Sequence, residues 1–230
     1  YMSPEQAGRD ALDVDTRTGD KPYGIPSDNP FTGDKNAKPE IWTLGLRNPW
    51  RCSFDTGSGD LFCGDVQQNS YETIKVVGKG QNMGWRRVEG IMRCFDYLKP
   101  DDHPASCDKA GITPAIIEYN NCTAKPQGCK GISITGGYVY QGKEAGWKGK
   151  YIFGDWSKSF GEMDGQIFIA TKGGDGKWTM ETAEVTNRKG KLPYVLAFAQ
   201  DRSGEVYALT SITTGPNGSL YTISRIVPSK

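Results

Sequence analysis

Several features that would narrow the function at once are scarce in this chain. Its 230 residues include one histidine, and no apolar run approaches the roughly 20 residues that a membrane-spanning helix needs. An excess of one charge is also missing, because 28 basic residues are interspersed with 27 acidic ones and the net charge is +1. Without a basic stripe or an apolar span, we expect neither a nucleic-acid partner nor a transmembrane segment.

Helical periodicity is nearly as scarce, and only residues 4–11 could form a turn or two. The chain is rich instead in glycine, with 30 residues, and it carries 13 prolines beside many aromatic side chains. This mixture is typical of short strands joined by tight turns. With 36% hydrophobic and 24% charged residues, the composition supports a single folded domain over residues 1–230.

Apolar and β-branched runs recur along the chain, separated by Gly or Asp turns. They predict strands over Ile41–Leu46, Trp50–Asp55, Asp60–Val66, Glu72–Val77, Ser133–Tyr140, Tyr151–Trp156, Gln166–Thr171, Trp178–Val185, Val195–Asp201, Glu205–Thr210 and Ser219–Ile226. Several of them open with a glycine turn and an apolar-aromatic run, as in Gly59–Phe62 and Gly149–Phe153. This repetition predicts an all-β fold of antiparallel blades, with a β-sandwich as the alternative. The polar segment from Gly90 to Thr113 is expected to be a long loop on one face.

The six cysteines are spaced as an even set. If Phe54 faces Leu61 across the turn, Cys52 lies directly opposite Cys63, at the separation that a disulfide needs. Zinc is the competing interpretation, but no pair has zinc-knuckle spacing, and the single histidine, His103, lies in a polar loop. Sequential pairing is our prediction among the possible connectivities: Cys52–Cys63, Cys94–Cys107 and Cys122–Cys129.

Two glycosylation sequons point to the same oxidising environment as the cysteines. They are Asn121-Cys122-Thr123 and Asn217-Gly218-Ser219, and each alone is a weak signal because the triplet arises often by chance. Together with the predicted disulfides, they predict a secreted, extracellular protein.

Six phrases carry more than a general β signal, and they occur in a fixed order. They are Pro22–Phe31, Gly45-Leu46-Arg47-Asn48-Pro49-Trp50-Arg51-Cys52-Ser53-Phe54-Asp55, Leu61-Phe62-Cys63-Gly64-Asp65-Val66-Gln67-Gln68-Asn69, Gly80-Gln81-Asn82-Met83-Gly84-Trp85-Arg86, Ile134–Tyr140 and Tyr151–Trp156. In these phrases the chain resembles the soluble quinoprotein glucose/sorbosone dehydrogenase family. The cysteine-containing versions are closest to its eukaryotic, hedgehog-interacting-protein-like branch.

The resemblance implies a six-bladed β-propeller, of which this chain supplies strands for roughly four blades. Because its start resembles the middle of family members, we expect the remaining blades to come from the same precursor or from another chain. In the enzymatic members, the resemblance also implies pyrroloquinoline quinone (PQQ) and calcium held over the central channel, where an aldose sugar is oxidised.

The resemblance places Arg47 and Asn48 on the pair that contacts the quinone, a role for which a guanidinium is suited. The structural alternative is a turn at Asn48 with Arg47 paired to a nearby Asp. Gln67 and Gln68 fall where the family presents two main-chain carbonyls to calcium. Many members have Gly at the position of Gln67, so that loop is altered if its backbone needs a positive φ. The alternative is a plain polar loop.

Other positions match the family less well. Trp85 and Tyr138 lie in well-matched phrases but are more often core aromatics than cofactor contacts. Lys158 lies near a cofactor-binding Lys of sugar-oxidising members, although an exposed Lys is the simpler interpretation. The late arginine pair of those members is not evident. Their histidine base comes from an early blade, and we do not assign that role to His103.

Two functions therefore stand. The first is a secreted PQQ- and calcium-dependent aldose dehydrogenase whose histidine base lies outside this chain. The second is a non-catalytic extracellular propeller that binds a protein or a glycan, which the altered calcium loop and the missing arginines favour.

Overall fold

The computed structural model describes residues 24–99, 103–214 and 220–229, and this part of the chain is almost entirely β. Its strands are β1 (Pro49–Phe54), β2 (Leu61–Val66), β3 (Tyr71–Val77), β4 (Val88–Glu89), β5 (Arg93–Cys94), β6 (Ile117–Asn120), β7 (Ile134–Val139), β8 (Tyr151–Asp155), β9 (Gln166–Lys172), β10 (Trp178–Thr182), β11 (Tyr194–Gln200), β12 (Val206–Ser211) and β13 (Tyr221–Arg225). The one helical element among the described residues is the 3-10 turn η1 (Ala145–Trp147). None of the described helical structure is long and apolar enough to cross a bilayer.

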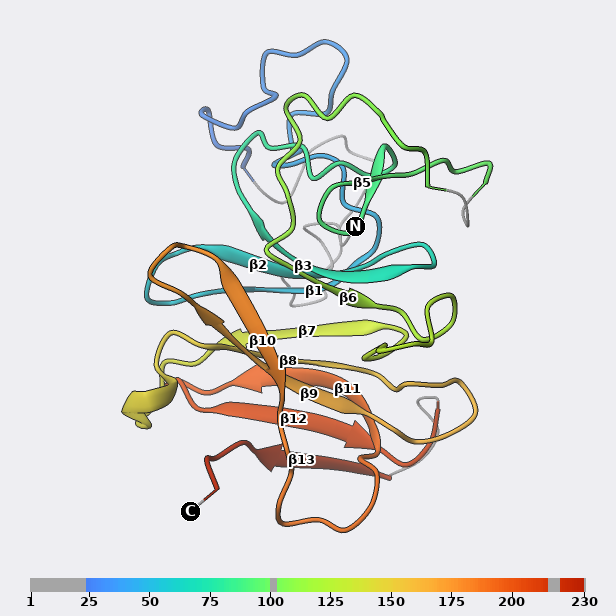
Figure 1. Ribbon diagram of the computed structural model, residues 1–230. Helices are drawn as coiled ribbons and strands as arrows, with labels where there is room; N and C mark the ends of the chain where they lie inside the picture. The colour runs from blue at the N-terminus through green and yellow to red at the C-terminus, as the bar shows by residue number, and fades with distance from the viewer. Residues whose placement is uncertain (1–23, 100–102, 215–219, 230) are drawn as a thin grey trace, which may run out of the picture.

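The strands form three antiparallel meanders that follow one another along the chain. The first sheet has the order β1-β2-β3-β6, the second β7-β8-β9-β10 and the third β11-β12-β13. Figure 1 shows the three sheets side by side in chain order, with the β4–β5 hairpin beyond the first sheet. The first strands of neighbouring sheets pack against each other, β1 on β7 and β7 on β11. Meanders that touch through their first strands are blades of a propeller, which confirms the predicted fold class.

The described residues contain three such blades, where the sequence predicted strands for about four. The segment Ile41–Leu46, predicted as a strand, runs beside residues 80–85 but contributes only an isolated bridge between Leu44 and Asn82. The fourth strand of the first sheet, β6, was missed because the long loop before it separates it from β3. The β4–β5 hairpin belongs to that loop, so it adds no blade.

A repeated Gly-Asp pair ends the second strand of the first two sheets, as Gly64-Asp65 and Gly154-Asp155. The glycine lets the next sheet approach closely: a Cβ on Gly64 would lie 2.7 Å from the amide nitrogen of Gly136 in β7. The first strand of each sheet also carries a register shift near its start, between Pro49 and Arg51 in β1. The same irregularity recurs in β7 and β11, so the three blades share one backbone design.

Two apolar cores fill the spaces between the blades. The cluster between the first and second sheets includes Phe62, Ile74, Tyr151, Phe153 and Phe168. The cluster between the second and third sheets includes Tyr140, Ile152, Val195, Phe198 and Val206. Burial of this surface between sheets is the main favourable contribution to the free energy of folding.

Candidate functional site

The Arg47-Asn48 pair lies where the chain enters β1, and a buried carboxylate fixes its backbone. Asp65, at the end of β2, is paired in register with Pro49 and is fully buried. Its Oδ1 accepts the N–H of Asn48 at 2.7 Å and the N–H of Arg47 at 3.1 Å. Charge-assisted bonds of this kind are stronger than neutral ones, so the direction of both residues is well defined.

The Arg47 side chain folds over the first residues after β2. Its Nη1 donates to the Val66 carbonyl at 3.0 Å, and its Nε donates to Gln68 Oε1 at 3.0 Å. The guanidinium carbon lies 5.6 Å from the centre of the Trp85 ring. A guanidinium has more N–H donors than these two bonds use, so the group can still bind a planar anion above Trp85.

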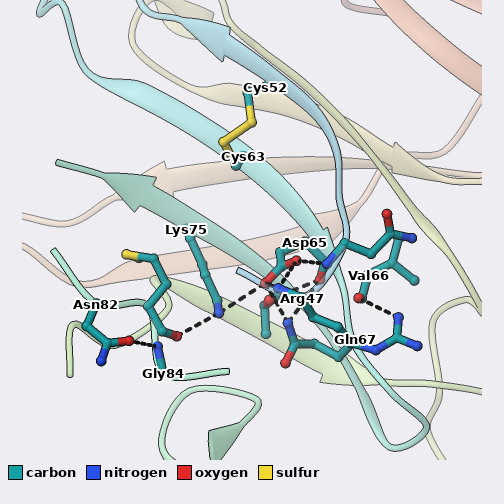
Figure 2. A network of polar contacts seen from close by, with 12 residues as sticks. Arg47, Cys52, Cys63, Asp65, Val66, Gln67, Lys75, Asn82 and Gly84 are labelled. Carbon is teal, nitrogen blue, oxygen red and sulfur yellow. Dashed lines mark hydrogen bonds and ion pairs between the residues drawn. A yellow bond between two sulfur atoms is a disulfide. The ribbon is translucent and has the colours of Figure 1, made fainter. Parts of the chain in front are cut away.

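A buried lysine balances the charge of Asp65. Lys75 lies on β3 with 2% of its side chain exposed, and its Nζ is 3.1 Å from Asp65 Oδ2. The same ammonium donates to the Met83 carbonyl at 2.9 Å. Figure 2 shows Lys75 approaching Asp65 from the side opposite the Arg47 backbone. Removing two charges from water costs several kcal/mol per ion, so such a pair persists only with good geometry and further hydrogen bonds.

Gln67 and Gln68 point in different directions. The Gln67 side chain is buried, and its Nε2 donates to Asp65 Oδ2 at 2.7 Å. Its Oε1 is buried and has no hydrogen-bond partner among the described residues. The Gln68 side chain instead accepts from Arg47. The Gln67 side chain that replaces the family's glycine is therefore accommodated inside the fold, against Asp65.

A second buried carboxylate holds the far end of this loop. Glu89, on β4, is fully buried, and its Oε1 accepts the N–H of Asn69 at 3.0 Å and the N–H of Ser70 at 2.9 Å. The loop of residues 67–70 is thus bounded by Asp65 at its start and by Glu89 at its end.

The single histidine packs against the same loop. His103 Nδ1 lies 2.9 Å from the Cys94 carbonyl, and its Nε2 lies 3.2 Å from Ser70 Oγ. Nε2 is also 3.4 Å from Glu89 Oε2. Both ring nitrogens therefore face protein groups, which suits a structural contact better than a base directed at a substrate. The sequence placed His103 in a polar loop and gave no sign of its contact with Ser70.

The donor chemistry of the site fits the two groups that the family resemblance implies to different degrees. Arg47 offers a guanidinium over an aromatic ring, which fits the carboxylates and carbonyls of a quinone cofactor. A calcium ion wants oxygen ligands, and the orphaned Gln67 Oε1 adds one to the two main-chain carbonyls predicted for this role. The carboxylate closest to these glutamines, Asp65, is already paired with Lys75. The described ranges hold no group of three or more His, Cys, Asp or Glu residues that could bind a metal, so main-chain and amide oxygens would have to supply the ligands here.

All six cysteines pair sequentially, as the spacing predicted. The bonds are Cys52–Cys63, Cys94–Cys107 and Cys122–Cys129. Cys52 and Cys63 are direct partners of the β1–β2 register, and so are Phe54 and Leu61. The Cys94–Cys107 bond closes the loop that carries His103 and brings it against Ser70.

The structure disfavours the predicted glycan on Asn121. Its side chain is 5% exposed, and its Nδ2 donates to Glu72 Oε1 at 2.8 Å and to the Ile132 carbonyl at 3.0 Å. A glycan on that nitrogen would replace one of its two N–H groups and so remove at least one of the buried bonds, and burying unpaired polar atoms is costly. The second predicted glycosylation site, Asn217, lies outside the described residues.

Glu72, which accepts a hydrogen bond from Asn121, belongs to a cluster of buried acids between the first two sheets. Burial, followed by the charge of Asp155, raises the pKa of Glu72 well above its ordinary value. Burial raises the pKa of Asp155 to about 6, although four groups donate to its carboxylate. One of these donors is the Tyr119 hydroxyl, at 2.6 Å from Oδ2. The cluster is buried in the interface between blades.

The structure thus brings together four predicted residues, Arg47, Asn48, Gln67 and Gln68, around one acid that the sequence analysis did not single out. Trp85 joins them beneath Arg47, whereas Tyr138 packs beside the second core. Asp65, Lys75 and Glu89 were missed as functional residues. Two signals could have found the first two: the Gly-Asp pair recurs as Gly154-Asp155, and Lys75 lies between the apolar residues Ile74 and Val76.

Comparison with known proteins connects this site to a family. Residues 20–222 match the family model described as Glucose / Sorbosone dehydrogenase. The HIPL1 protein of Arabidopsis thaliana is 35% identical over 204 residues, which cover 82% of this chain and 29% of that protein. Hedgehog-interacting protein of Mus musculus is 30% identical over 217 residues, which cover 92% of this chain and 27% of that protein. The chain therefore spans less than a third of the length of these relatives.

Solved structures agree on the fold. A glucose dehydrogenase crystal structure superposes with a TM-score of 0.63 at 18% identity, covering 89% of this chain and 52% of that one. The PQQ-bound aldose sugar dehydrogenase of Streptomyces coelicolor superposes with a TM-score of 0.54 at 14% identity, covering 85% of this chain and 45% of that one. At these identities the likeness concerns the arrangement of blades, of which this chain supplies about half.

Proposed function

The chain belongs to the glucose/sorbosone dehydrogenase family, and we propose that the complete protein is an exported quinoprotein that oxidises an aldose sugar. In this proposal, Arg47 and Asn48 bind PQQ, and the main-chain carbonyls of Gln67 and Gln68 hold calcium. The quinone would supply the acceptor for the hydride that leaves the sugar. Arg47 would orient it and stabilise the negative charge that grows on its oxygens.

One observation supports this proposal above the others. Arg47 is clamped to Val66 and Gln68 and lies over Trp85, so a charged, planar donor is held in one orientation beside the predicted cation loop. A guanidinium with only a structural role would more often pair with a carboxylate. The Arg47 guanidinium instead donates to a carbonyl and to an amide oxygen. Neither acceptor is charged, so no ion pair between described residues neutralises the guanidinium.

The proton acceptor of the reaction would come from outside the described residues. His103, the single histidine of the chain, is held against Cys94, Ser70 and Glu89. The proposal therefore requires a base from other blades, consistent with the share of the relatives' length that this chain spans.

Those further blades would also cover exposed apolar residues on the first and third sheets. Trp50 and Phe54 on β1 are 51% and 65% exposed, and Ile223 on β13 is 72% exposed. The middle sheet, in contrast, is buried from β7 to β8. We propose that blades from the rest of the precursor cover both exposed ends, because contiguous apolar surface of this kind marks an interaction site. Closure by a second polypeptide would appear instead as a stable hetero-oligomer.

The test uses the full-length protein reconstituted with PQQ and Ca²⁺, with aldose-dependent dye reduction and quinone binding as readouts. Arg47→Met is expected to weaken quinone binding by at least about tenfold, because it removes charge-assisted hydrogen bonds. Arg87→Met is the matched control, because Arg87 pairs with Asp108 at the exposed surface. No turnover together with no Ca²⁺-dependent quinone binding by the wild type would rule out the dehydrogenase.

A non-catalytic extracellular binding propeller is the second candidate function. The engaged His103 and the already neutralised Asp65 favour it, since His103 contacts protein groups through both ring nitrogens and Asp65 is paired with Lys75. In that case the loop face would bind a protein or a glycan, and the same assay would show neither turnover nor quinone binding while the protein stays folded.

A further inference from the structure

We infer that Asp65, balanced by Lys75, is the positioning residue that holds Arg47-Asn48 and Gln67-Gln68 in one fixed arrangement. The inference rests on the proposed function, and it adds a residue that touches neither ligand. The two predicted binding segments lie about twenty residues apart in the sequence, and one carboxylate joins them, because Asp65 accepts from Arg47, Asn48 and Gln67.

Each oxygen of the Asp65 carboxylate serves one segment more closely than the other. Oδ1 receives the shorter bonds from the backbone of Arg47 and Asn48, whereas Oδ2 receives the Gln67 amide at 2.7 Å. The bond from Arg47 Nε to Gln68 Oε1 is a second, direct link between the two segments. A displacement of the carboxylate would therefore move both segments together (Figure 2).

The neighbouring blade shows what the same acid does without a binding site. Asp155 occupies the equivalent register position, opposite Ile134, and its carboxylate accepts the N–H of Ile132 and Ser133. Capping the start of the first strand is thus a structural duty common to both acids. Asp155 also accepts the N–H of Ser157, which occupies the position equivalent to Gln67. What Asp65 adds is a bond from the Gln67 side chain and the ion pair with Lys75.

Lys75 neutralises the buried charge of Asp65, so the Arg47 guanidinium does not have to. Its ammonium is buried and contacts Asp65 Oδ2 and the Met83 carbonyl, so the acid stays compensated without drawing on Arg47. The Arg47 guanidinium thereby remains available for a ligand. An arrangement in which Arg47 itself neutralised Asp65 would use up the group that the quinone needs.

The test compares Asp65→Asn with Asp155→Asn in the full-length protein, by amide hydrogen exchange and by binding of PQQ with Ca²⁺. In Asp65→Asn we expect exchange at the backbone amides of residues 47 and 48 and at the Gln67 side-chain amide to speed up by at least about tenfold, and PQQ binding to weaken by a similar factor. Asp155→Asn should speed exchange at residues 132 and 133, while PQQ binding stays within about twofold of wild type.

A double variant, Asp65→Asn with Lys75→Met, separates positioning from stability. It should regain the melting temperature that either single change loses, because no uncompensated charge stays buried, yet PQQ should still bind weakly. Wild-type exchange at the backbone amides of residues 47 and 48 and at the Gln67 side-chain amide in Asp65→Asn, or equal loss of PQQ binding in Asp155→Asn, would overturn the inference. If wild type binds no PQQ, the proposed function fails, and the exchange rates alone decide whether Asp65 positions the two segments.

Discussion

The first and second blades share one backbone design, but they carry polar and apolar side chains, respectively, at equivalent positions in the centre of the sheet. In the second blade, Gly137 is paired in register with Phe153, and Phe153 with Phe168, whose rings lie 5.1 Å apart. At the equivalent positions of the first blade, Cys52 is paired with Cys63, and Cys63 with Lys75. A disulfide and a buried ammonium thus replace an aromatic pair.

The difference shows where this chain departs from what stability alone would select. Aromatic packing stabilises a blade without burying a charge, whereas a buried ion pair is often no better than an apolar replacement. The first blade accepts that ion pair at the place where Arg47 and the glutamine loop meet. The disulfide lies beside it and offsets part of the lost packing. A buried ion pair in one blade, replaced by an aromatic pair in its neighbour, makes this position a candidate for function.

The largest expected effect comes from removing the buried lysine of the first blade, Lys75. Lys75→Met should destabilise the protein by about 3–5 kcal/mol, because it leaves the fully buried Asp65 without a cation. Chemical denaturation measures the loss. The double variant with Asp65→Asn should lose much less, and an equal loss in both would show that Lys75 contributes by packing, as Phe168 does.

The buried acid of the second blade should make stability depend on pH. The pKa of Asp155 is raised from 3.8 to about 6, so the folded state binds its proton more tightly than the unfolded chain does. Its contribution to stability is therefore fully present below about pH 4 and is lost as the pH rises through about 6, by about 3 kcal/mol. The difference between wild type and Asp155→Asn, measured by denaturation from pH 4 to 8, should follow that slope. A difference independent of pH would contradict the raised pKa.

The disulfide should have the smallest of the three effects. Replacing Cys52 and Cys63 by alanine opens a loop with a sequence separation of 11. We expect a loss of about 2–3 kcal/mol, chiefly because the unfolded chain gains freedom. The β1–β2 register is also held by its hydrogen bonds, so exchange rates within these strands should change little. Loss of the hairpin itself would show that the disulfide, and not the ladder, sets the register.

The repeated glycine turns and strands were enough to predict an all-β fold of antiparallel blades, and the family resemblance favoured a propeller over a sandwich. The cysteine spacing predicted the three sequential disulfides. Strand pairing within a blade and these disulfides depend on contacts between residues close in the chain. Strand β6 escaped prediction because it pairs with β3 across a long excursion, and Ile41–Leu46 failed as a strand because its neighbours are loop residues. Asn121 looked like an exposed sequon, yet its amide lies in the buried acid cluster between blades.

By itself, the sequence determined the residue types of the candidate site: Arg47, Asn48, Gln67 and Gln68 were identifiable from their phrases alone. Only the tertiary structure decided what holds them, since Asp65 and Lys75 become partners when β2 and β3 pair and are then closed off from water. Burial gives a carboxylate and an ammonium their strength and their cost, and burial is a property of the assembled blades that no local pattern of residues records.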